Sequence, residues 1–148
     1  MDRNLYERAN DCRWWALAAV FAEPAVASDT VRAGRRETIG SILRTINGLY
    51  TVYSNLIVLD GDGRIVATSN AASELAGTGA RRRHGSRALL RVCADAQGYA
   101  VSALRARRRS TTTGPTYIYG AAIRTPQQPQ AVGGVAIVFD PSRNCAPC

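Results

Sequence analysis

The spacing of apolar residues changes sharply near residue 50, and this change limits what the chain can fold into. Residues 36–50 carry apolar side chains at helical spacing, at Ile39, Ile42, Leu43, Ile46 and Leu49. Beyond this stretch, residues 55–60 (NLIVLD) and 64–69 (RIVATS) are short β-favouring runs on either side of a Gly-Asp-Gly turn. Such a pair of runs predicts a β-hairpin, so helices followed by a sheet, an α+β fold, are expected.

The same criteria locate the other elements of the chain. Residues 4–22 have helical spacing and are followed by Pro24, which ends a helix, and residues 25–34 are expected to form a short helical or loop connection that ends at Gly34. Three further strands are expected at residues 99–104, 116–124 and 131–140. Residues 70–97, here called the insert, are irregular apart from a short helix expected at 86–94, and a connection of this length is commonly functional.

Length and composition predict one folded domain with a basic surface. The 148 residues are enough for one domain, and 46% of them are hydrophobic. The net charge is +8, and all nineteen basic residues are Arg. This balance leaves two interpretations open, a solvated Arg-rich surface or a module that binds anions or nucleic acid. We expect a single domain at 1–140 and a disordered tail at 141–148.

The sequence shows neither a targeting signal nor a complete set of metal ligands. No apolar run is long enough to span a bilayer and no signal-peptide pattern is visible, which predicts a cytoplasmic protein. Cys145 and Cys148 form a C-x-x-C pair without two further ligands at zinc spacing. Asp60 and Asp62 lack the other ligands of a calcium loop, and turn chemistry accounts for them. We therefore expect neither a metal nor a cofactor.

Three segments resemble the Cache branch of PAS-like sensor domains. They are residues 55–69 (NLIVLDGDGRIVATS), 116–124 (TYIYGAAIR) and 131–140 (AVGGVAIVFD). The resemblance implies a five-stranded antiparallel sheet with the N-terminal helices on one face. It also implies that the insert covers the other face and encloses a small ligand. Ligands of the family include amino acids, carboxylates, amines and purines, and its output domains include those of bacterial chemotaxis-type receptors.

Candidate ligand-binding residues follow from strand alternation and from side-chain chemistry. Tyr117 and Tyr119 fall on one face of their strand, and Tyr99 lies in the expected neighbouring strand. Such aromatic walls are typical of a small-ligand pocket, although ordinary cross-strand packing explains the tyrosines equally well. Arg87 and Arg91, one helical turn apart in the insert, are candidates for binding a carboxylate, with solvent-facing side chains as the alternative.

The first helix carries a candidate interface. Trp14 and Trp15 are adjacent, so they cannot both face the same side of a helix. One is expected to pack on the sheet, while the other, with Arg13, meets a partner or a second copy of the chain. Core packing of these residues is the alternative.

No set of residues matches a catalytic motif. The chain has a single His and lacks both a phosphate loop and a G-x-S-x-G motif, so we expect no enzymatic activity. The leading hypothesis is a sensor domain that binds a small organic metabolite, such as a carboxylate, for a signalling output protein. A dimerisation or scaffold module without a ligand, and an Arg-rich module that binds anions or nucleic acid, are the alternatives.

Overall fold

The computed structural model describes residues 7, 11–12, 14–16, 20–21, 29–50, 53–71, 100–104 and 116–139. The elements with complete bounds are one helix and the strands of a sheet: α3 (Asp29–Leu49), β1 (Tyr53–Asp60), β2 (Ile65–Thr68), β3 (Ala100–Leu104), β4 (Thr116–Thr125) and β5 (Gln128–Phe139). The described residues between positions 11 and 21 are also helical. They fall within residues 4–22, where the sequence predicts a helix.

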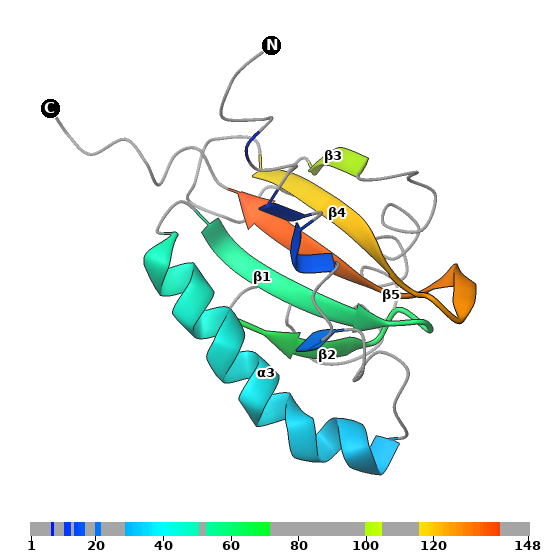
Figure 1. The fold of residues 1–148 in the computed structure, drawn as a ribbon. Coiled ribbons are helices and arrows are strands. Elements are labelled where there is room, and N and C mark those ends of the chain that lie inside the picture. Colours follow the sequence, from blue (N-terminus) through cyan, green and yellow to red (C-terminus); the bar gives the residue numbers. More distant parts are fainter. Residues whose placement is uncertain are drawn as a thin grey trace, which may run out of the picture.

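The strands form one sheet in the order β2-β1-β5-β4-β3, and every neighbouring pair is antiparallel (Figure 1). The last strand in the sequence therefore lies in the middle of the sheet, between the first strand and the fourth. The antiparallel sheet and the α+β class expected from the sequence are confirmed.

Helix α3 begins earlier than the sequence analysis predicts. The expected connection at 25–34 overlaps a helix that begins at Asp29 and continues without a break to Leu49. Asp29 and Thr30 are residue types that favour a helix start, whereas Gly34 was given too much weight as a breaker. Gly34 is exposed and a Cβ there would meet nothing within 4 Å, so the helix passes through it unhindered.

One face of the sheet packs against the N-terminal segments, and α3 crosses β1 and β2 on this side (Figure 1). We call it the helix-side face. Its buried core combines helical residues with alternate residues of the strands: Cys12, Ala16, Phe21, Ile39, Leu43, Tyr53, Leu56, Val58, Val66, Ala67, Tyr119, Ala121, Ile123, Val132, Val135 and Ile137. Because the helix-side residues of α3 recur every three to four positions, one stripe of the helix reaches the sheet.

The β1–β2 hairpin is closed by the buried side chain of Asp60. Its Oδ1 accepts hydrogen bonds from the backbone N–H groups of Asp62 (3.0 Å) and Arg64 (2.8 Å). Gly63 takes a φ of 77°, a conformation that suits glycine. The DGDG residues therefore form the turn of the hairpin, as the sequence predicts.

The β4–β5 hairpin is tighter than expected. Thr125 pairs with Gln128, so only Pro126 and Gln127 form the turn, and β5 begins three residues before the expected start at 131. The Pro and Gln residues at 126–129 suggested a longer link. Because β5 begins at Gln128, residues 128 and 129 belong to the strand and not to the link.

Several predictions lie outside the described residues. They are the insert from residue 72 onward, with its short helix, and the tail at 141–148, so the 1–140 domain boundary stays a prediction. In the described part of the chain, no helix is both long and apolar enough to cross a lipid bilayer.

The turn geometry predicts opposite effects of the same substitution at two glycines. Gly63→Ala places a Cβ at positive φ and is expected to lower the free energy of unfolding by about 1 to 2 kcal/mol. Gly34→Ala, in the open middle of α3, is expected to raise it by roughly 0.5 to 1 kcal/mol. Urea denaturation of both variants measures these changes, and equal effects at the two sites would contradict the turn assignment.

Candidate functional site

The two faces of β4 and β5 differ strongly in side-chain bulk. On the helix-side face, β4 presents Tyr119 and Ile123, and β5 presents Val135 and Ile137. The opposite face, here called the second face, holds a separate buried cluster formed by Ile57, Leu59, Ile65, Ile118, Ala136 and Val138. Strand alternation adds Gly120, Ala122 and Gly134 to this second face, so its centre is built largely from the smallest residues.

The register gathers these small residues into one patch. Gly120 lies opposite Ala136, and Ala122 lies opposite Gly134. We call these four residues the small-residue floor. No side chain longer than a methyl group stands on them, so a neighbouring group can approach their backbones closely.

Bulkier side chains border the floor on two sides. Ile57 and Leu59 of β1 lie opposite Ala136 and Gly134, and Ile118 pairs with Val138 at one end. All four are buried, so the second face is an interior surface like the helix-side face. The smallest residues of the second face therefore lie between larger apolar side chains.

The N-terminal helix packs directly behind the floor. The Cys12 sulfur donates to the carbonyl oxygens of Val135 (3.4 Å) and Tyr119 (3.7 Å). These carbonyls belong to the peptide units that lead into Ala136 and Gly120, two floor residues. A single layer of backbone therefore separates the floor from the first helix.

Aromatic contacts hold the same helix at the start of β1. The Trp15 ring makes edge-on contacts with Tyr50 and Tyr53, with ring centroids 5.9 and 5.8 Å apart. The Tyr53 hydroxyl donates to Asp11 Oδ2 at 2.5 Å. Tyr50 directly follows α3 and Tyr53 begins β1, so this cluster ties the first helix to both elements.

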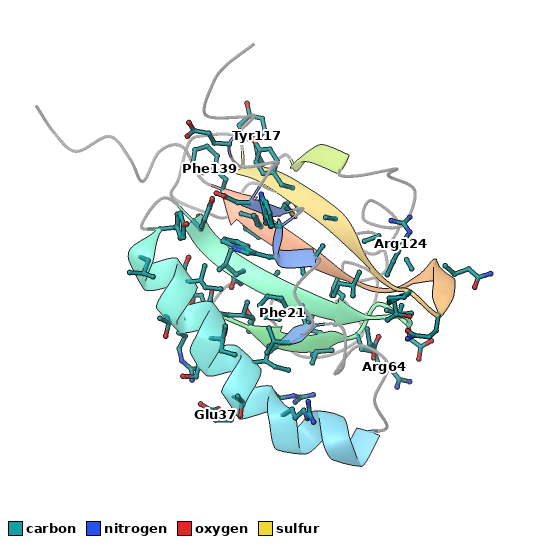
Figure 2. All side chains as sticks on the ribbon, viewed as in Figure 1. Phe21, Glu37, Arg64, Tyr117, Arg124 and Phe139 are labelled. Carbon is teal, nitrogen blue, oxygen red and sulfur yellow. The ribbon has the colours of Figure 1, made fainter. Side chains whose placement is uncertain are left out.

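The structure places the candidate tyrosines on the helix-side face. Tyr117 and Tyr119 share a face, as strand alternation predicts, and Figure 2 shows Tyr117 beside its β5 partner Phe139. This face packs against the N-terminal helices, and Tyr119 is fully buried there. Their position agrees with the packing alternative rather than with the expected pocket beneath the insert. Alternation fixes which residues share a face but not which layer covers it, and a ligand-binding role for either tyrosine stays a prediction.

The other candidate residues divide between the described and the undescribed parts of the chain. Trp15 is half-buried in the aromatic cluster, whereas the Trp14 side chain is 73% exposed, so the two indoles face different environments. Arg13, Arg87, Arg91 and Tyr99 lie outside the described residues. Among the described residues, no three His, Cys, Asp or Glu side chains gather closely enough to hold a metal ion.

Sequence reasoning missed the floor, although its signal is present in two segments. In TYIYGAAIR, the two alternate residues that follow Ile118 are Gly120 and Ala122, and AVGGVAIVFD repeats this pattern at Gly134 and Ala136. Both stretches suggested β-strands because of their Tyr, Ile and Val residues. Register between the two strands was needed to bring the small residues together.

Comparison with known proteins supports the fold assignment. The sensor domain of the V. cholerae histidine kinase DctB superposes with a TM-score of 0.62 at 14% identity, over 92% of this chain and 48% of that one. The extracellular domain of rpHK1S-Z16, assigned as a histidine kinase, gives a TM-score of 0.51 at 14% identity, over 94% of this chain and 60% of that one. The chain thus spans about half of the first structure's length. No family model and no curated protein matches the sequence.

These neighbours correct one expectation and confirm another. The predicted cytoplasmic location is wrong, since a matched structure is an extracellular domain and the absence of a visible leader was insufficient grounds for that prediction. The resemblance found in the sequence is confirmed by the strand order and by the sensor-domain neighbours. The chain has the fold of a Cache-type, PAS-like sensor domain.

Proposed function

We propose that this domain binds a small organic ligand over the small-residue floor, outside the cytoplasm, and reports its presence to a signalling output domain. The observation that carries the proposal is the floor itself, a low apolar patch in the centre of the buried second face. Its fold neighbours are sensor domains of histidine kinases, which supports a sensory role.

The side chains of the floor suit binding better than catalysis. Within the described part of the second face, Gly, Ala, Ile, Leu and Val form the floor and its apolar borders. Asn55 lies in the row beside the floor, and none of these side chains transfers a proton. An apolar surface of this kind contributes roughly 25 cal/mol for each Å² of ligand that it removes from water. Polar groups that orient the ligand then come from elsewhere, and Arg87 and Arg91 in the insert remain the proposed partners of a carboxylate.

The net charge of +8 favours an anionic ligand because a basic protein raises the local concentration of anions. Small carboxylates and amino acids are therefore the first compounds to test. The output is proposed to be a kinase of the kind to which the fold neighbours belong, or a chemotaxis-type receptor. Either arrangement places the signalling chemistry in another domain or chain.

Two neighbouring alanines allow a matched test of the floor. Ala122→Val fills the floor, whereas Ala121→Val adds the same two methyl groups to the helix-side face. Overpacking is expected to destabilise each variant by about 1 to 3 kcal/mol. Thermal shift assays with small carboxylates, amino acids, amines and purines measure binding, and a ligand at about 100 times its Kd stabilises the folded state by about 2.7 kcal/mol.

The ligand-induced rise in Tm is expected to persist in Ala121→Val and to disappear in Ala122→Val. Gly120→Ala, which adds a single methyl group, serves as a milder floor variant if Ala122→Val does not fold. Two results would count against the proposal. In the first, Ala121→Val loses the Tm response while Ala122→Val keeps it. In the second, no compound stabilises the folded wild-type protein.

A homodimer is a second candidate function, favoured by exposed apolar side chains near the first helix. Trp14 is 73% exposed and Leu49 is 77% exposed, and Tyr50 beside Leu49 contacts Trp15. If this surface joins two copies of the chain, Trp14→Ala is expected to convert a dimer into a monomer in light-scattering measurements. Arg64→Ala, in the exposed β1–β2 turn, is the control. An unchanged mass for Trp14→Ala would remove this surface as the contact.

A further inference from the structure

Asn55 is a fully buried polar residue in the apolar strand β1, and its side chain forms four hydrogen bonds. Oδ1 accepts from the Thr68 hydroxyl (2.6 Å), the Ser69 hydroxyl (3.1 Å) and the Asn70 N–H (2.9 Å). Nδ2 donates to the Asn70 carbonyl oxygen at 3.2 Å. All these partners lie in three consecutive residues at the end of β2 and just beyond it.

The contact with Asn70 reproduces one step of a β-ladder with a side chain. In an antiparallel pair, two residues exchange an N–H and a C=O in each direction. Here the carboxamide of Asn55 supplies both the acceptor for the Asn70 N–H and the donor for the Asn70 carbonyl. The backbone of Asn70 is therefore held at both of its polar groups, although the regular β1–β2 pairing has ended at Thr68.

Neighbouring bonds extend this substitute pairing. The Ser69 N–H donates to the Leu56 carbonyl, and the Leu56 N–H donates to the Ser69 hydroxyl, each at 2.9 Å. Asn70 Nδ2 lies 3.4 Å from the Ser54 carbonyl oxygen. The chain leaving β2 is thus bonded to three successive residues of β1.

Asn55 lies in register with the border of the floor. It pairs with Val138, which in turn pairs with Ile118, so these residues form the row next to Ala136 and Gly120. Asn55 also alternates with Ile57 and Leu59 along β1, which places it on the second face. The carboxamide therefore fixes the exit from β2 at a corner of the proposed site.

We infer that Asn55 is a positioning residue for the ligand site: through Asn70 it sets the direction in which the chain leaves β2 beside the floor. The effect on ligand affinity rests on the proposed function, whereas the effect of Asn55 on the exit from β2 rests on the observed hydrogen bonds alone. Asn55 need not touch the ligand. Its replacement changes where the connection after β2 begins, and thereby changes affinity.

Leu43→Ala provides a control that also truncates a buried side chain but breaks no hydrogen bond to residues 68–70, where the chain leaves β2. Leu43 is fully buried on the helix-side face. Asn55→Ala removes all four side-chain hydrogen bonds. Thr68→Val keeps the side-chain shape but removes the hydroxyl, which donates to Asn55 Oδ1 and also lies 3.4 Å from the backbone nitrogen and the carbonyl oxygen of Asn70. Thr68→Val also maintains a usable test if Asn55→Ala does not fold.

The first measurement needs no ligand. Hydrogen exchange is followed by mass spectrometry in peptides that cover residues 69–97, at a temperature where all variants are folded. Asn55→Ala is expected to exchange about tenfold faster than Leu43→Ala in these peptides, and Thr68→Val is expected to fall between Leu43→Ala and Asn55→Ala. Equal exchange in Asn55→Ala and Leu43→Ala would overturn the inference.

The second measurement uses two probes, a mixture of amino acids and a mixture of small mono- and dicarboxylates. The Tm response to the active mixture is expected to be lost in Asn55→Ala and retained in Leu43→Ala. An equal response in both variants would overturn the role of Asn55 in binding. If neither mixture stabilises the wild-type protein, the proposed function fails for these ligand classes, while the exchange measurement still decides the positioning role.

Discussion

The pairing of β5 with both β1 and β4 is the constraint on which the rest of the structure depends. Because each β5 residue is in register with a residue on either side, its alternation decides the composition of both faces of the sheet. Val135 and Ile137 fill the helix-side core, while Gly134 and Ala136 leave the centre of the second face low. A slip of one residue would exchange these two sets, burying small residues under the helices and raising the floor.

The close approach of the first helix follows from the same arrangement. A sulfur atom packed on the carbonyl oxygens of Tyr119 and Val135 requires a small side chain in the helix, and Cys12 supplies it. Contacts among Trp15, Tyr53 and Asp11 fix the helix at the start of β1. A ligand over the floor would act on the strand segments that also carry this helix. Ligand binding shifts the helix only if the ligand has a higher affinity for one conformation of the domain than for another.

Local sequence signals predicted much of this fold. Apolar spacing identified the helix at 36–50, and the β-favouring runs around DGDG identified the hairpin, because both signals depend on neighbouring residues. The start of α3 at Asp29 was missed because Gly34 resembled a helix end. In the middle of α3 this glycine lowers helix propensity by only about 1 kcal/mol, which tertiary packing overrides.

Features that depend on distant residues were not predictable in the same way. The layer that covers Tyr119 is decided by packing with residues more than one hundred positions away, such as Cys12. The four residues of the floor come from two strands and meet only through register. Asn55 begins the β-favouring run NLIVLD, and nothing local marks it, because its partners at 68–70 meet it only when the hairpin closes. The cytoplasmic location rested on a missing signal rather than on a physical property of the domain.

Methyl NMR tests the central claim most directly, because consecutive residues of β4 and β5 report on opposite faces. The labelled protein is titrated with the mixtures of carboxylates and of amino acids. We expect the methyl signals of Ala122 and Ala136, on the second face, to shift first and to saturate, while those of Ala121 and Val135 move less. Shifts concentrated at Ala121 and Val135, with Ala122 and Ala136 unchanged, would show that the ligand does not bind over the floor.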